Sequence, residues 1–155
     1  MIEIIYRPYH ETLRQLMAGA MQLFGYAVLV DCHSMPSSGA NSKTTKQTDI
    51  IIGDRYGTSC NGEISREIIR RFSDLGYNVA RNTPYAGGFI TEHYGRPLKG
   101  LHAVQIEINR ALYMDEATLH PTAEFQSLAD DIHSVMAHLV NLSDSGFTPI
   151  SVAAE

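Results

Sequence analysis

The chain has 155 residues, of which 44% are hydrophobic, so it is long and apolar enough to form one domain with a real core. Its formal net charge is −5 and no cluster of lysines and arginines appears, which argues against nucleic acid as a partner. Because it has no membrane-length apolar run, no secretory signal sequence and only two cysteines, the sequence predicts a cytoplasmic protein without a membrane span or a disulfide framework.

Apolar spacing and the positions of glycine and proline predict helices and strands that alternate along most of the chain. In chain order, the predicted elements are a helix at 8–24, strands at 26–32 and 49–53, a helix at 63–75, strands at 77–81 and 103–108, and a helix at 121–142. The run at 26–32 is apolar throughout, which is typical of a strand covered on both faces. A long polar loop is predicted at 34–46 and a glycine-rich stretch at 83–101. The alternation indicates an α/β domain with a mostly parallel or mixed sheet flanked by helices.

The first predicted strand ends in Asp31-Cys32-His33-Ser34, so it brings an imidazole to the C-terminal edge of the sheet. Ligands of α/β folds bind at that edge, which makes His33 the best single candidate for a metal ligand. Asp31 lies two residues earlier on the same strand face and would orient the imidazole. The alternative is a capping or buried structural histidine, held by Asp31 or by a backbone carbonyl.

Glu107 is an acidic residue inside an apolar strand. By strand alternation it shares a face with Gln105, while the aliphatic residues share the other face. One interpretation is a general base in a cleft, with a pKa tuned by partial burial. The other is a half-exposed strand with a solvated polar face.

The run at 87–97 places His93, Tyr94 and Arg96 within four residues, between glycines. Arg96 could bind a substrate carboxylate through two parallel hydrogen bonds, and Tyr94 or His93 could donate a hydrogen bond to an oxyanion. The glycine pair at 87–88 could let the backbone approach a ligand. The alternative is an irregular surface loop without a function.

A second polar cluster at 53–60 contains Arg55 and Cys60. Arg55 either faces the same cleft as Arg96, where two arginines would bind a dicarboxylate, or pairs with Asp54 on the surface. Cys60 could be a nucleophile with His93 or His102 as its base, or a small buried residue. The other histidines are expected to be solvated or to pack against neighbours, and they are His10, His120, His133 and His138.

Taken together, these motifs resemble the N-formylglutamate amidohydrolase (deformylase) family. The matching segments appear in family order and cover nearly all of the chain; they are residues 31–34, 53–60, 87–97, 102–109 and 113–116. The resemblance implies a zinc-carboxypeptidase-like α/β hydrolase fold with one zinc ion. It implies His33 as a zinc ligand and Glu107 as the general base. The implied substrate is N-formyl-L-glutamate or a related N-acyl amino acid, which is cleaved to formate and glutamate.

One departure from the family pattern shapes this expectation. Family members carry an earlier strand of the type Ile-Pro-His-Ser-Gly and a downstream acidic residue, which are expected to supply the remaining metal ligands. No segment of residues 1–155 has that context, so we expect a single, truncated domain equivalent to the C-terminal part of the family domain. Since a catalytic zinc normally has three protein ligands, the zinc would be incompletely coordinated. An inactive fragment and a cysteine hydrolase using Cys60 are the alternatives, and the sequence does not indicate an oligomeric state.

Overall fold

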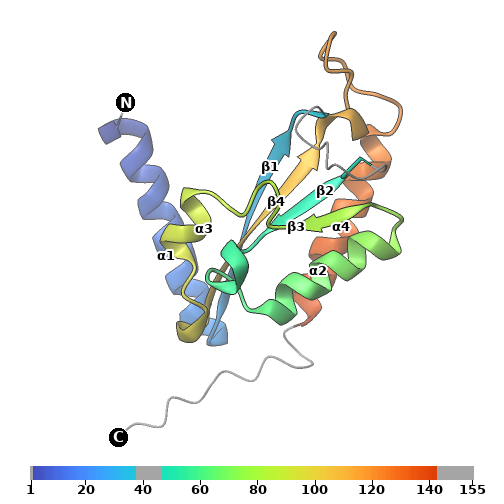
Figure 1. Ribbon diagram of the computed structural model, residues 1–155. Helices are drawn as coiled ribbons and strands as arrows, with labels where there is room; N and C mark the ends of the chain where they lie inside the picture. The colour runs from blue at the N-terminus through green and yellow to red at the C-terminus, as the bar shows by residue number, and fades with distance from the viewer. Residues whose placement is uncertain (1, 38–46, 143–155) are drawn as a thin grey trace, which may run out of the picture.

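The computed structural model describes residues 2–37 and 47–142. Most of the predicted polar loop at 34–46 therefore lies outside the described residues. Four strands form one mixed sheet in the order β1-β4-β2-β3, and Figure 1 shows helices on both of its sides. The strands are β1 (Ala27–Met35), β2 (Ile50–Gly53), β3 (Val79–Arg81) and β4 (Leu101–Asn109). The helices are α1 (Arg7–Phe24), α2 (Gly62–Asp74), α3 (Phe89–Tyr94) and α4 (Phe125–Leu142).

Strand direction in the sheet confirms the predicted α/β class and makes the sheet mixed. β1 runs parallel to β4, β2 runs parallel to β3, and β2 and β4 are antiparallel. The parallel pair β1–β4 is the longest pairing, and it runs in register from Ala27 opposite Leu101 to Met35 opposite Asn109. Within the described ranges, no helix is long and apolar enough to cross a membrane.

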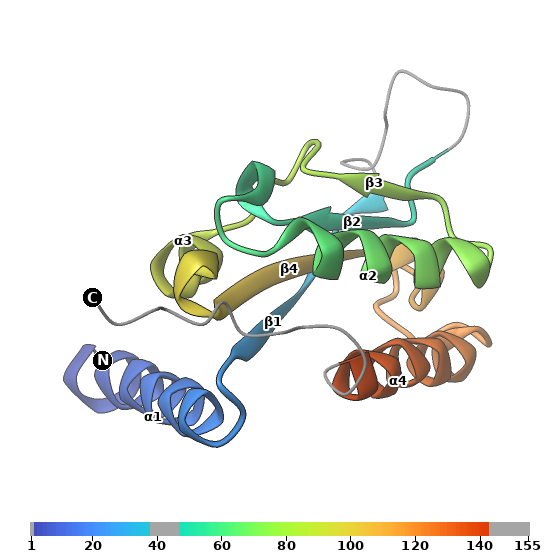
Figure 2. The ribbon, with the colours of Figure 1, turned by 90° about the horizontal axis from the view of Figure 1, so that it is seen from below.

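Two hydrophobic clusters hold helices on opposite faces of the sheet. On one face, α2 and α4 pack on the aliphatic residues of the central strands; the buried core here includes Ile50, Ile52, Ile64, Ile68, Phe72, Val104, Ile106 and Val135. On the other face, α1 and α3 cover the first residues of β1 and β4 through Met17, Ala27, Tyr94 and Ala103. Figure 2 shows α1 and α4 on the two sides of β1. The second face is covered only in part, and its uncovered stretch carries the polar residues described below.

The expectation that residues 26–32 form a strand covered on both faces was wrong. β1 is an edge strand of the described sheet, and Cys32, His33 and Ser34 are exposed. The strand is also longer than predicted, because its pairing with β4 continues to Met35. The glycine-rich stretch at 83–101 contains the short helix α3, which apolar spacing did not predict.

An ionic cluster joins α2 to α4. Glu67 of α2 accepts hydrogen bonds from Arg70 and Arg71 of the same helix, and it lies 2.7 Å from Nε2 of His138 on α4. The hydrogen bond from Arg70, together with those from Arg71 and His138, lowers the pKa of Glu67 to about 2, although desolvation opposes this shift. The carboxylate therefore stabilises the fold only while it is ionised.

This cluster predicts a specific pH dependence of the free energy of unfolding. The folded-state pKa of Glu67 lies below its ordinary value of 4.5, so its contribution is complete above that value and is lost as the pH falls towards 2. In urea unfolding at a series of pH values, Glu67→Gln should lose stability at neutral pH and show a shallower loss between pH ~4.5 and ~2. The exposed Glu124→Gln serves as the control and should follow the wild-type curve. Parallel curves for Glu67→Gln and the wild type would contradict the assignment.

Gly53, the last residue of β2, is required by a close backbone approach. A Cβ at this position would lie 2.7 Å from the backbone nitrogen of Gly87. Gly53→Ala should therefore displace the loop at 86–88 and lower the free energy of unfolding by about 1–3 kcal/mol. Gly19→Ala on α1 is the matched control, because its Cβ would meet no atom within 4 Å and helix propensity favours alanine. Chemical denaturation tests both variants, and equal stability of Gly53→Ala and the wild type would contradict the prediction.

Candidate functional site

The pairing of β1 with β4 gathers four polar side chains on one face of the sheet. His33 lies opposite Glu107 and Asp31 lies opposite Gln105. Since side chains alternate along a strand, all four point to the face that also carries α1 and α3. They follow Leu29 and Ala103, which those helices cover, so the cluster begins where the helical cover ends.

The predicted metal ligand His33 lies within contact distance of both its orienting carboxylate and the predicted base. Nε2 of His33 is 3.1 Å from an Asp31 carboxylate oxygen, and Nδ1 is 3.8 Å from a Glu107 carboxylate oxygen. The His33 side chain is 48% exposed, whereas that of Glu107 is only 8% exposed. The cluster therefore pairs a buried carboxylate with an imidazole that solvent and ligands can reach.

These residues do not by themselves fit a complete catalytic zinc site. Among the residues that the structure describes, no three or more histidine, cysteine, aspartate or glutamate side chains are grouped to hold a metal ion. A catalytic zinc normally takes three protein ligands and keeps a fourth position open. His33 remains the candidate ligand, and the rest of the ligand set is not found in the described part of the chain.

Gln105 positions the predicted base, a role that the sequence did not predict. Its amide nitrogen donates a hydrogen bond to Glu107, and its amide oxygen accepts one from the backbone N–H of Gly88 at 2.7 Å. Gln105 is buried, so both bonds lie away from solvent. The glycine pair at 87–88 thus brings the backbone close to Gln105 and Gly53. Strand alternation could have indicated this role, because it places the side chain of Gln105 on the same face of β4 as that of Glu107.

The structure places the two predicted arginines on one cavity of about 700 Å³, which Lys99 also lines. Arg55 donates a long hydrogen bond, 3.4 Å, to the carbonyl of Gly87 and forms an ion pair with Glu92. The next residue, Gly88, donates its backbone N–H to Gln105, and Gln105 bonds Glu107. A short chain of contacts therefore connects Arg55 to the predicted base. Arg96 lines the same cavity, and its guanidinium donates hydrogen bonds to the backbone carbonyls of residues 92 and 95. These contacts connect Arg55, rather than Arg96, to the polar cluster.

The surface ion pair between Asp54 and Arg55 is not present. Asp54 is fully buried and accepts hydrogen bonds from Arg81 and Asn82. Burial acts to raise the pKa of Asp54, but the hydrogen bond from Arg81 and those of its other partners outweigh it, so the pKa is lowered. Asp54 therefore fixes the start of the polar turn, and Arg55 is left to face the cavity.

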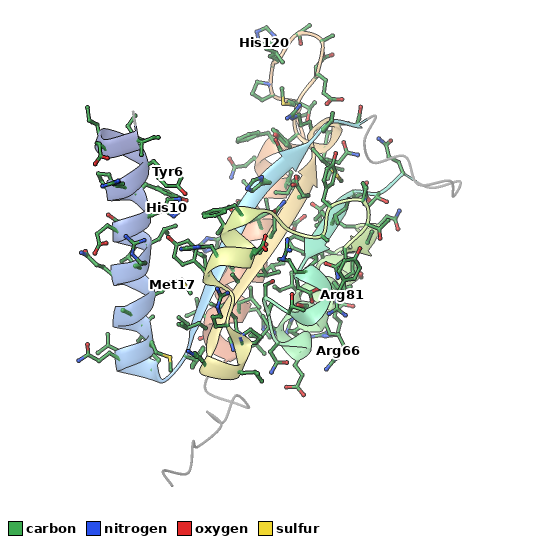
Figure 3. All side chains as sticks on the ribbon, turned by 60° about the vertical axis from the view of Figure 1, so that its left-hand side comes forward. Tyr6, His10, Met17, Arg66, Arg81 and His120 are labelled. Carbon is green, nitrogen blue, oxygen red and sulfur yellow. The ribbon has the colours of Figure 1, made fainter. Side chains whose placement is uncertain are left out.

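Tyr94 and His93 lie in the contact between α3 and α1. The Tyr94 hydroxyl is 2.6 Å from Nδ1 of the buried His10, and the His93 ring makes an edge contact with the His10 ring at a centroid distance of 6.1 Å. Figure 3 shows His10 and Met17 of α1, and Tyr6 directly before it, on the side that faces α3. The structure does not bring Tyr94 or His93 into contact with His33 and Glu107. Their predicted role at an oxyanion stays a prediction, and their observed role is to join the two helices.

The environment of Cys60 contradicts the cysteine-hydrolase alternative. The thiol is fully buried, and burial raises its pKa to about 12. His102, one of the two proposed bases, is also buried, and its Nδ1 accepts a hydrogen bond from the backbone N–H of Asn61. A neutral, solvent-shielded thiol is not a nucleophile at neutral pH. Cys60 is a core residue.

Comparison with known proteins assigns this chain and its α/β fold to a hydrolase family. The family model for N-formylglutamate amidohydrolase matches residues 1–114. The chain is 35% identical to the N-formylglutamate deformylase of Pseudomonas putida over 140 residues, which cover 90% of this chain and 52% of that relative. It is 33% identical to the deformylase of Pseudomonas aeruginosa, with 88% and 51% covered. The chain therefore belongs to the N-formylglutamate amidohydrolase family.

A solved structure supports the same assignment. The N-formylglutamate amidohydrolase from Ralstonia eutropha JMP134 superposes with a TM-score of 0.82 at 33% identity, over 92% of this chain and 51% of that chain. The chain thus spans about half the length of the relatives it matches.

The difference in burial between the two cysteines predicts selective alkylation. Under native conditions at pH ~8, iodoacetamide should modify the exposed Cys32 and leave Cys60 unmodified, because only the thiolate reacts and a pKa near 12 leaves almost none. Peptide mass spectrometry measures both sites, and the same reaction in denaturant is the control in which both should react. Native modification of Cys60 at the rate of Cys32 would contradict the assignment of Cys60 to the core.

Proposed function

We propose that this chain contributes the base-carrying half of an N-formylglutamate amidohydrolase, which hydrolyses the formamide bond of N-formyl-L-glutamate to formate and glutamate. The observation that carries the proposal is the contact cluster of His33, Asp31 and Glu107 in a chain of this family. The names of the Pseudomonas relatives support this small-molecule substrate.

Glu107 is suited to take a proton from the attacking water and to pass it to the leaving amine. Gln105 would hold the carboxylate in one orientation, because its amide bonds both Glu107 and the backbone of Gly88. Asp31 would fix the orientation of the His33 ring through the contact at Nε2. Zinc is the proposed cofactor and His33 its proposed ligand, and the described residues do not complete the ligand set.

The arginines of the neighbouring cavity are suited to the substrate's two carboxylates. A guanidinium pairs with a carboxylate through two parallel hydrogen bonds, and Arg55 and Arg96 lie on the same cavity. Arg55 would take the carboxylate nearer to the scissile bond because of its link to Gly87, and Arg96 would take the other.

A second candidate is a family member without turnover of its own. It is favoured by the shortage of metal ligands in the described part of the chain and by the match to only about half of each relative. The two candidates differ in whether formate is released when this chain is combined with the rest of the family domain.

Formate release from N-formyl-L-glutamate tests the proposal directly. The wild-type chain should release formate when zinc is supplied and the part of the Pseudomonas putida deformylase outside the 140-residue match is co-expressed as a separate polypeptide. Under the same conditions Glu107→Gln should lower kcat by at least about 100-fold, because removing a general base costs this much. Glu11→Gln, on the solvent-facing side of α1, is the control and should retain wild-type turnover. The absence of formate release by the wild-type chain would favour the second candidate, and full turnover by Glu107→Gln would contradict the role of Glu107.

A further inference from the structure

The turn after β2 holds Arg55 in a strained backbone conformation. The φ angles of Arg55 and Tyr56 are 51° and 57°, in the left-handed region that residues other than glycine rarely adopt. Such conformations persist only where surrounding contacts hold them, and they are concentrated at functional sites. The turn therefore depends on specific partners, which keep the Arg55 side chain on the cavity that it shares with Arg96.

Hydrogen bonds hold the backbone of Arg55 on both sides. Its N–H donates to the carbonyl of Ala86 at 2.8 Å. Its own carbonyl accepts hydrogen bonds from the backbone N–H of Thr58 at 3.1 Å and from the Thr58 hydroxyl at 2.7 Å. The side chain then reaches the carbonyl of Gly87 and the carboxylate of Glu92. The position of the guanidinium is thus set by the conformation of the turn.

Asp54 anchors the beginning of this turn with both of its carboxylate oxygens. Oδ1 accepts hydrogen bonds from the backbone N–H of Gly57 at 3.1 Å and from the side-chain amide of Asn82 at 2.8 Å. Oδ2 accepts the Nε–H of Arg81 at 3.0 Å and a second N–H of the same guanidinium. The backbone N–H of Asp54 in turn donates to the side-chain oxygen of Asn82. Since Asp54 is fully buried, its charge depends on this cation and these donors.

Arg81 balances the charge of Asp54 from a distant strand. It lies on β3, which β2 separates from β4 and from Glu107 (Figure 1). It is not one of the described residues that line the arginine cavity. Without its guanidinium, the buried carboxylate would lack a counter-ion, so it would become protonated or turn away. Either change weakens the hydrogen bond to Gly57 and loosens the turn.

We propose that Arg81 is a positioning residue for substrate binding. Through Asp54 it holds the turn at 54–58 in its left-handed conformation, and the turn holds the guanidinium of Arg55 where a substrate carboxylate binds. The effect on the substrate rests on the proposed function. Glu107 is held by separate contacts through Gln105, so loss of Arg81 should weaken binding and spare the proton transfer.

Chemical modification of Arg55 tests the positioning without turnover. Phenylglyoxal modifies accessible guanidinium groups, and peptide mass spectrometry measures the rate at each arginine of this chain. The Arg55 side chain is 34% exposed, so its modification in Arg81→Gln should become about two- to threefold faster as it leaves Gly87 and Glu92. Arg66→Gln is the matched control, because it removes the same charge from an exposed position on α2 (Figure 3) and should leave the rate at Arg55 unchanged.

Steady-state kinetics test the effect on the substrate. Formate release is measured with zinc and with the co-expressed part of the Pseudomonas putida deformylase that lies outside the 140-residue match. Arg81→Gln should raise KM for N-formyl-L-glutamate by at least about tenfold, the loss expected for one charge-assisted pair, and keep kcat within about twofold of the wild type. Arg81→Lys keeps the cation without the planar fork, so it should be intermediate in both measurements. Arg66→Gln should match the wild type.

Two results would overturn the proposal. One is an Arg55 modification rate in Arg81→Gln equal to that of the wild type, since the turn would then not depend on Arg81. The other is a fall in kcat at unchanged KM, which would place the effect at Glu107. Circular dichroism verifies the fold, and Arg81→Lys replaces Arg81→Gln in both measurements if the latter does not fold. Faster modification of Arg55 without formate release by the wild type would support the role of Arg81 and count against the proposed function.

Discussion

The parallel pairing of β1 with β4 is the interaction on which the candidate site depends. Its register sets His33 opposite Glu107 and Asp31 opposite Gln105, and a shift by one residue would send one strand's polar pair to the opposite face. The register is held on both faces, because Leu29 and Ala103 pack under α1 and α3 while Val104 and Ile106 pack under α2 and α4. The hydrophobic core thus determines which polar groups meet.

Buried polar groups near this pairing are satisfied by specific partners. Gln105 bonds both Glu107 and the backbone of Gly88, and Asp54 bonds Arg81 and Asn82. Removing one partner from such a network leaves a buried polar group without a hydrogen bond, which costs about 1–3 kcal/mol. The loop at 86–88 is therefore fixed from two sides, by Gln105 and by the close approach to Gly53. This rigidity keeps Glu107 in one orientation while His33 stays open to solvent.

Much of the fold and part of the site followed from the sequence. Alternation within each strand predicted that Asp31 shares a face with His33 and that Gln105 shares one with Glu107, and the motifs predicted the family.

The contact between the two pairs depends on which strands are neighbours, which local patterns do not encode. An apolar run such as 26–32 looks the same whether it lies inside a sheet or at the edge of the described part, so the exposure of β1 was not predictable. The six residues of α3 are too few to show helical periodicity. The burial of Asp54 depends on Arg81, which lies 27 residues later in the chain.

The central claim is that the β1–β4 register builds one side of a hydrolase site that a second half completes. The zinc content of the complex between this chain and the unmatched half of the Pseudomonas putida deformylase tests it most directly. The account predicts about one zinc per complex, tighter binding than by this chain alone, and loss of that zinc in His33→Ala while the complex stays intact. Undiminished zinc binding by the His33→Ala complex would contradict it.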